Sequence, residues 1–263
     1  MLTKLATITF VAVLSLSPPL EQDQAQEIAA LRKQVQELRD QQAQMQRELT
    51  AIKNFLQSLM QQARPQGGAQ EPEIPGLVGA SVPTAGEPVL GSTAAKVTIM
   101  EVSDYQCPFC KRQALSTFPQ IEADYIRTGK VQYMFVDYPI AQLHPTAARS
   151  HEAARCAGEQ GKYWEMHRSL FANPVAKDDA SLLAQAKGVG VDAARLQSCL
   201  ASGKFTASVQ ASVQRMEALG IGGTPMILIG LTPAPGQPMK IVKFVYGAQP
   251  FGAFKTALDS LLQ

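Results

Sequence analysis

A hydrophobic run that ends in two cysteines, spaced Cys-x-x-Cys, constrains the fold of this chain more than any other feature. Residues 97–103 are mostly apolar and β-branched, which is typical of a buried strand. Cys107 and Cys110 follow, and residues 107–126 have the pattern of a helix with Pro108 in its first turn. The sequence therefore predicts an α/β protein in which a strand delivers two thiols to the start of a helix.

The rest of the domain predicts a sheet of mixed strand direction. The stretch VQYMFVDYP, from residue 131, predicts a second strand, and a long Ala-rich helical region follows over about 145–219. Two later apolar runs, TPMILIG and MKIVKFVYG, predict further strands before a final helix at 250–262. A helical block placed between strands in this way indicates one α/β sheet with both parallel and antiparallel pairs.

A heptad pattern precedes this domain. Apolar residues recur at alternating steps of three and four between residues 28 and 59, and nine of the ten seam residues are apolar. The seam consists of Ile28, Leu31, Val35, Leu38, Gln42, Met45, Leu49, Ile52, Leu56 and Leu59. Because such a stripe has no core of its own to cover it, residues 27–62 predict a coiled-coil helix that self-associates as a dimer or a trimer.

The N-terminal residues 1–20 predict export. Lys4 precedes an apolar run at 5–16, which has the length of a signal-peptide core and is too short to span a bilayer comfortably. A clear cleavage motif is missing, so a cleaved signal peptide and a retained membrane anchor both stay open. Export to the periplasm, or to another extracytoplasmic compartment, would place the four cysteines where disulfides persist. Residues 63–86 are rich in Pro and Gly and predict a linker to a domain at 87–263.

Composition and residue counts exclude several functions. The net charge of +2, without a basic stripe, gives no reason to expect a nucleic-acid partner. One close cysteine pair and three histidines in the whole chain argue against structural zinc, which commonly takes four such ligands. A purely structural Cys107–Cys110 disulfide would close a very small loop and stabilise the fold little.

Redox chemistry fits the cysteine pair better. At a helix N-terminus, free N–H groups and the helix dipole would stabilise a Cys107 thiolate, and Cys110 could then resolve a mixed disulfide. The stretch GIGGTPMILI places Pro225 directly before a strand, so the Thr224–Pro225 bond is a candidate cis peptide. Beside the dithiol, it would leave backbone groups free to pair with a substrate segment.

Three segments, EVSDYQCPFC, AARCAGEQGKYWEMHRSLFA and GIGGTPMILI, occur in this order and together resemble the DsbA-like family of thioredoxin-fold disulfide oxidoreductases. The resemblance covers roughly 87–263 and implies a thioredoxin fold with a helical insertion at about 143–220. It implies that Cys107 is the exposed nucleophile and Cys110 the resolving cysteine. Thr224 and Pro225 would form the cis-Pro loop.

The resemblance also implies that Glu101 is the buried acid near the disulfide. A carboxyl group in an apolar strand would be desolvated, which raises its pKa and allows it to exchange a proton with Cys110. Asp104 is nearer in sequence and is a lesser candidate, because it is expected in the turn.

The chain departs from the best-known members of this family between its active cysteines. Pro108 and Phe109 stand there in place of Pro-His, and the loss of the histidine removes a possible stabiliser of the Cys107 thiolate. We therefore expect these two residues to tune the pair towards a weaker oxidant. The added coiled coil resembles that of oligomeric isomerase-type relatives, including trimeric ScsC-like proteins, which slightly favours a trimer.

The two remaining cysteines, Cys156 and Cys199, both fall in the predicted helical block. A disulfide between two of its helices, closing a separation of 43 residues, would stabilise the fold by about 3–4 kcal/mol in the chain-entropy model.

The sequence thus predicts an exported thiol:disulfide oxidoreductase, in the first place a dithiol oxidase, which needs no metal or organic cofactor. Its partners would be substrate proteins with cysteines and a membrane protein of DsbB type that restores the disulfide. One alternative is an oligomeric isomerase or reductase kept reduced by a DsbD-type partner. Another is a non-catalytic envelope scaffold or metal-handling protein.

Overall fold

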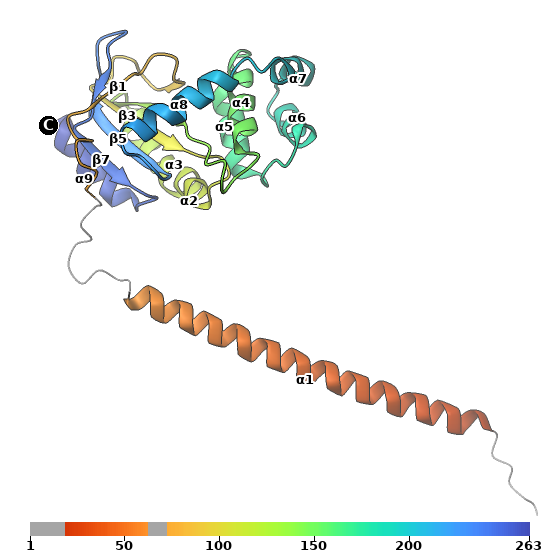
Figure 1. The fold of residues 1–263 in the computed structure, drawn as a ribbon. Helices are drawn as coiled ribbons and strands as arrows, with labels where there is room; N and C mark the ends of the chain where they lie inside the picture. The colour runs from red at the N-terminus through yellow and green to blue at the C-terminus, as the bar shows by residue number, and fades with distance from the viewer. Residues whose placement is uncertain (1–18, 63–72) are drawn as a thin grey trace, which may run out of the picture. The chain divides into compact units, whose positions relative to one another are not determined.

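The computed structural model describes residues 19–62 and 73–263, and the chain divides into two units at residue 70. The first unit holds helix α1 (Pro19–Gln62), which begins earlier than the heptad pattern indicates (Figure 1). Residues 1–18, which carry most of the predicted signal segment, lie outside the described residues. Within the two described ranges, none of the helices combines the length and the apolar content needed to span a bilayer.

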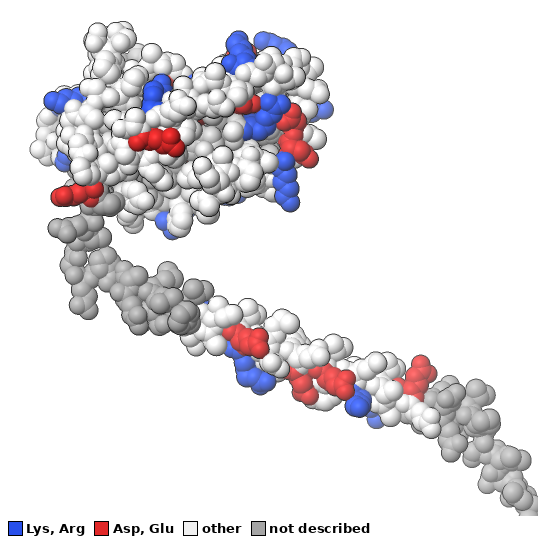
Figure 2. Space-filling model, viewed as in Figure 1, with Lys and Arg blue, Asp and Glu red and all other residues white. Residues whose placement is uncertain are grey.

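The predicted seam of α1 is solvent-exposed in the single chain. Seven of its apolar side chains are exposed: Ile28, Leu31, Val35, Leu38, Met45, Leu49 and Ile52. Figure 2 shows acidic and basic side chains interspersed along the same helix, and Lys33 and Glu37 form an ion pair across one turn. The helix therefore presents an apolar stripe between charged faces, as a coiled-coil strand does.

The second unit is built on a five-stranded sheet in the order β2-β4-β3-β5-β7. Its strands are β2 (Val89–Leu90), β3 (Val97–Ser103), β4 (Val131–Asp137), β5 (Met226–Leu231) and β7 (Lys243–Tyr246). β3 pairs in parallel with β4, and the other neighbours pair antiparallel, which gives the mixed sheet that the sequence predicts. All seven residues of both β3 and β4 are buried, because these strands lie inside the sheet and are covered on both faces.

One face of the sheet is covered by the helix that follows β3 and by the last helix. The first of these is an uninterrupted helical stretch of four consecutive segments, α2 (Pro108–Arg112), η1 (Gln113–Thr117), α3 (Phe118–Ile121) and η2 (Glu122–Ile126). η1 and η2 are π-helical. The last is α9 (Phe251–Leu262). Phe118 and Ile121 from the first stretch and Phe254 from α9 pack with β-strand side chains in one apolar cluster. This packing fixes the start of α2 above the end of β3.

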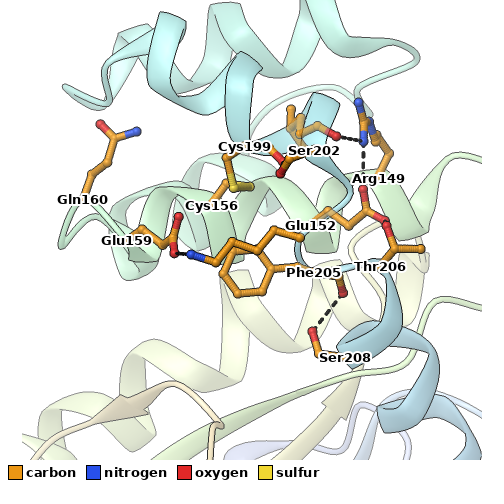
Figure 3. Close-up of a disulfide and its surroundings, with 12 residues drawn as sticks. Arg149, Glu152, Cys156, Glu159, Gln160, Cys199, Ser202, Phe205, Thr206 and Ser208 are labelled. Atoms are coloured by element: carbon orange, nitrogen blue, oxygen red, sulfur yellow. Dashed lines mark hydrogen bonds and ion pairs between the residues drawn. A yellow bond between two sulfur atoms is a disulfide. The ribbon is translucent and has the colours of Figure 1, made fainter.

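Five helices lie between β4 and β5: α4 (Ala147–Gly158), α5 (Tyr163–Ala172), α6 (Asp179–Gly188), α7 (Ala193–Ser202) and α8 (Thr206–Ala218). α4 to α7 gather at one end of the domain (Figure 1), while Met216 of α8 belongs to the apolar cluster on the second face of the sheet. Cys156 on α4 and Cys199 on α7 form a disulfide (Figure 3).

A buried ionic network joins the insertion to the sheet. Asp137, at the end of β4, is 2.7 Å from Nδ1 of His151 and also pairs with Arg155, both on α4. Arg155 in turn binds Glu87 at 2.6 Å, and Arg215 of α8 reaches the other oxygen of Glu87 at 2.5 Å. These pairs connect the sheet, α4, α8 and the segment just before β2, so they fix the helical insertion against the sheet.

Two sequence expectations about the fold are wrong in detail. The predicted linker ends too late, because Leu77 and Val82 are buried in the domain core and β1 (Ser81–Val82) pairs with β6 (Met239–Lys240) in a second small sheet. The single strand predicted at 239–247 is split, since β6 pairs with β1 whereas β7 pairs with β5. Both errors arise from short pairings between distant segments, which leave little local pattern.

Candidate active site

Cys107 and Cys110 lie at the junction of β3 and α2. Cys107 is the N-cap of α2, with an extended backbone, and Pro108 occupies the first turn. Both cysteines carry free thiols. The sequence implied an exposed nucleophile, but Cys107 is only 6% exposed and Cys110 is fully buried. Cys107 is therefore the more accessible of two largely covered cysteines.

The surroundings of Cys107 favour its thiolate. A hydrogen bond from the Cys110 thiol is the largest of the causes that lower the pKa of Cys107 to about 5, and the backbone N–H groups of Phe109 and Cys110 act in the same direction. A thiol with this pKa is ionised at neutral pH, when it is both a ready nucleophile and a good leaving group.

Cys110 has the opposite character. Burial raises the pKa of this thiol well above its usual value, and its hydrogen bond to Cys107 adds to the effect. The proton of Cys110 is therefore held at neutral pH, and Cys110 needs a base before it can attack a mixed disulfide.

Glu101 lies on β3, six residues before Cys107, and is 1% exposed. Burial raises the pKa of Glu101 to about 7, although a hydrogen bond from Tyr133 opposes the rise. The Tyr133 hydroxyl donates to Oε2 of Glu101 at 2.6 Å. A carboxyl group with a pKa near neutrality can either give or accept a proton at the working pH.

The Thr224–Pro225 peptide bond is cis. The backbone of Thr224 lies beside the dithiol, with the Cys107 sulfur 3.5 Å from the Thr224 carbonyl oxygen. Gly220 has a positive φ of 78° and opens the turn that leads to this bond. The structure therefore brings Cys107, Cys110, Glu101 and the Thr224–Pro225 loop together from segments more than a hundred residues apart.

Phe109 is 55% exposed next to Cys107 and stacks under the guanidinium of Arg112, 5.3 Å from the ring centre. Arg112 also donates to the carbonyl of Ala248 at 3.1 Å, and Lys111 donates to that of Asn173 at 3.1 Å. The first turns of α2 are thus tied on one side to the β7–α9 loop and on the other to the insertion.

The Asp104 side chain makes structural hydrogen bonds to the neighbouring loops, and among the described residues none of these bonds involves a thiol. One of its carboxyl oxygens accepts the N–H of Gln106 at 2.7 Å, and the other accepts the N–H of Ile140 and contacts Nδ1 of His144, both at 2.8 Å. This carboxyl group is buried and holds the loop before Cys107 against the loop after β4. The turn expected for Asp104 is present, and the side chain braces it.

The sequence predicts no functional role for the aromatic residues behind the dithiol, whose helical spacing indicates core packing. Tyr105 stacks on Phe135 at 5.0 Å between ring centres, and its hydroxyl lies 3.1 Å from Nδ1 of His167 and 3.3 Å from the hydroxyl of Tyr163. Burial lowers the pKa of His167 to about 3, so this histidine is neutral at physiological pH. The only local signal was the aromatic spacing of 163–171, which does not distinguish core from site.

A Cys-x-x-Cys helix facing a cis-proline, on a sheet interrupted by a helical insertion, is the arrangement of DsbA-like thiol:disulfide oxidoreductases. A family model described as Thioredoxin matches residues 83–234, which is more than half of the sequence. The chain therefore belongs to the thioredoxin family, and the predicted DsbA-like fold class is confirmed.

Three similar proteins match parts of this chain, which spans less than half the length of the two curated relatives among them. The chain is 37% identical over 91 residues, 33% of its own length and 39% of the relative's, to Disulfide bond formation protein D of Bacillus subtilis. It is 32% identical over 141 residues to the Na(+)/H(+) antiporter NhaA 3 of Salinispora tropica, covering 54% of this chain and only 21% of the antiporter. The crystal structure of α-DsbA1 from Wolbachia pipientis aligns with a TM-score of 0.61 at 21% identity, covering 69% of this chain and 93% of that chain.

Replacing Cys110 by alanine tests the origin of the low Cys107 pKa. Because the Cys110 hydrogen bond is its largest cause, we expect Cys110→Ala to raise the pKa of Cys107 from about 5 towards its ordinary value. The pH dependence of alkylation of Cys107 measures this value. Cys110→Ser is the matched control, since its hydroxyl still donates and should keep the pKa lower than alanine does. Equal pKa values in both variants would contradict this explanation.

Glu101→Gln tests the desolvation of the buried carboxyl through stability. The folded-state pKa of about 7 lies above the ordinary value of 4.5, so the contribution of Glu101 to stability is complete below pH 4.5 and is lost as the pH rises through 7. The variant should therefore exceed the wild type in unfolding free energy by about 3 kcal/mol at alkaline pH and lose this advantage in acid. Denaturant unfolding at several pH values measures the difference, and a pH-independent gap would contradict the raised pKa.

Proposed function

We propose that this protein is an extracytoplasmic thiol:disulfide oxidoreductase that acts on substrate proteins with cysteines through Cys107 and Cys110. The observation that carries the proposal is the pairing of an ionised Cys107, with its pKa of about 5, and a shielded, protonated Cys110 facing the cis Thr224–Pro225 bond. This combination supports disulfide exchange more than a structural role, for which neither a stabilised thiolate nor a cis-proline is needed.

The exchange proceeds in two steps. In the oxidised protein, a substrate thiolate attacks Cys107 of the Cys107–Cys110 disulfide, and Cys110 leaves as a thiolate that takes up a proton from Glu101. A second substrate thiolate then attacks the substrate sulfur of the mixed disulfide and releases the Cys107 thiolate. Two electrons pass from the substrate dithiol to the cysteine pair, and no cofactor is required.

The low pKa of Cys107 favours a dithiol oxidase as the first candidate. Stabilising the released thiolate stabilises the reduced form, which makes the disulfide more oxidising. Phe109 gives no charge to this stabilisation, so we expect a weaker oxidant than relatives with a histidine there. Pro108 and Phe109 are accordingly the residues proposed to tune the potential. An oxidase must be reoxidised, and a quinone-linked membrane partner of DsbB type would serve.

A second candidate is an oligomeric isomerase or reductase kept reduced by a DsbD-type partner. The exposed apolar seam of α1 favours it, because self-association would bring several dithiols around one substrate. Association could also obstruct docking to an oxidase. The export signal at 1–20, cleaved or retained as an anchor, is part of both candidates.

Activity assays separate these candidates from a non-catalytic scaffold. We expect the wild type to catalyse insulin reduction and refolding of scrambled ribonuclease, and Cys107→Ser to lose at least about a hundredfold in rate, since the nucleophile is gone. Trapping the thiols in cells then reports the direction: mostly oxidised Cys107–Cys110 supports the oxidase, and mostly reduced thiols support the isomerase. Equal inactivity of wild type and variant would favour a scaffold, and a tightly bound copper equivalent would favour metal handling.

Leu38→Asp tests self-association through α1. Leu38 is 63% exposed in the single chain, so its charge should disrupt a coiled-coil seam and shift the full-length protein towards monomer by at least about tenfold in dissociation constant. Analytical ultracentrifugation measures the shift and also distinguishes dimer from trimer. Ala51→Asp, at an exposed position off the seam of the same helix and one turn after Arg47, is the control and should change association little. A monomeric wild type would contradict the proposed oligomer.

A further inference from the structure

We propose that the Ser103 hydroxyl relays protons between Glu101 and Cys110, and that Tyr133 is the positioning residue that orients the carboxyl for this exchange. The inference rests on the proposed thiol–disulfide exchange. It adds two residues outside the Cys-x-x-Cys motif and the cis-proline loop.

The strand geometry places Ser103 between the carboxyl and the thiols. Glu101 and Ser103 are two residues apart on β3, so their side chains point to the same face of the sheet, and β3 then leads directly to α2. Ser103 is fully buried and Glu101 is 1% exposed. Water has little access to this path, so a proton that leaves Cys110 needs a protein group to receive it.

Two buried polar atoms on this path have no hydrogen-bond partner among the described residues. They are Oε1 of Glu101 and Oγ of Ser103. Unpaired buried polar atoms are uncommon, and two of them on one strand face next to a reactive thiol call for an explanation. Tyr133 holds Oε2 of Glu101 at 2.6 Å and so leaves Oε1 as the free oxygen.

The Ser103 hydroxyl also affects both groups that the relay would connect, Glu101 and Cys110. It lies close enough to Glu101 and to Cys110 to lower the pKa of each group. In this structure, however, its Oγ is not within hydrogen-bonding geometry of any described residue. A hydroxyl group both donates and accepts, and its proton rotates freely. Rotation of the serine side chain can therefore connect Oε1 of Glu101 with the sulfur of Cys110.

Other titratable groups face Glu101 from the surrounding elements. Tyr133 faces it from β4, Cys107 from the start of α2, and Tyr105 from the loop between β3 and α2. On the β5 side its register partner is the apolar Ile227. Because Cys107 thiolate raises the pKa of Glu101, the proton on Glu101 depends on the redox state of the pair.

The relay balances in both directions. When Cys110 leaves the disulfide, Glu101 gives its proton to Oγ of Ser103 while the Ser103 proton passes to the Cys110 sulfur. The products are a Glu101 carboxylate and a Cys110 thiol. When Cys110 attacks a mixed disulfide, the same protons return, and the released thiolate carries away the electron pair of the broken S–S bond.

A two-phase reaction of the reduced full-length protein with an aromatic disulfide tests the relay. The aromatic thiolate that this reagent releases is coloured, so each release is followed by absorbance. Attack by Cys107 on this reagent releases the first thiolate, and displacement by Cys110 releases the second. We expect the second release in the wild type to accelerate as the pH rises through the pKa of Glu101, because the carboxylate then accepts the proton. This step should lie below about 7, since Cys107 carries no charge in the mixed disulfide and no longer raises the pKa of Glu101. Ser103→Ala should slow the second release about tenfold at neutral pH, remove this pH step and leave the first release unchanged.

Three further variants sharpen the test. Ser103→Thr keeps the hydroxyl and should keep the pH step. Tyr133→Phe removes a hydrogen bond that lowers the pKa of Glu101, so the step should move to higher pH. Ser212→Ala removes another fully buried, unpartnered hydroxyl, on α8, and is the matched control that should leave both phases unchanged.

A Ser103→Ala protein with the wild-type second phase would overturn the relay. So would one that is slowed equally at every pH with the step retained, because that pattern indicates a structural role. A wild type that releases no first thiolate would instead overturn the proposed exchange itself, and the relay with it, so the two failures are distinguishable.

Discussion

The central strand β3 carries the constraint on which the site depends. It is paired on both sides, in parallel with β4 and antiparallel with β5, and every one of its residues is buried. A one-residue shift in the register of such a strand would move every side chain to the opposite face of the sheet and break the packing on both faces. Glu101, Ser103 and the start of α2 therefore have fixed relative positions, and the dithiol is held at one edge of the sheet.

Burial is the means by which this scaffold gives its thiols different properties. Desolvation raises the pKa of Cys110 and of Glu101, whereas hydrogen bonds directed at Cys107 lower its pKa. Two cysteines separated by two residues thus differ at neutral pH, Cys107 being a thiolate and Cys110 a protonated thiol. The stability lost by burying a carboxyl in the core is consistent with a functional site, since the same place would be more stable with a neutral residue.

The insertion and the thioredoxin-type core are joined by polar contacts as well as by apolar packing. Arg155 bridges Asp137 and Glu87, and Tyr105 bonds towards His167 of α5. Lys111 connects α2 to the end of α5 through the Asn173 carbonyl. A shift of the insertion would consequently disturb the loop before Cys107 and the first turns of α2 together.

The sequence by itself determined which segments next to the dithiol and the Thr224–Pro225 bond are strands and which are helices along the chain. Periodicity, a proline at a helix start and a proline before a strand are local signals, so they can be recognised without the tertiary structure. It also singled out Cys107, Cys110, Glu101 and the Thr224–Pro225 bond as site residues. Only the tertiary structure decided that Tyr133 bonds Glu101 and that Ser103 is fully buried, and it placed β1 against β6. These relations depend on strand register and on which face a side chain occupies, and both are set by pairing between segments far apart in the chain.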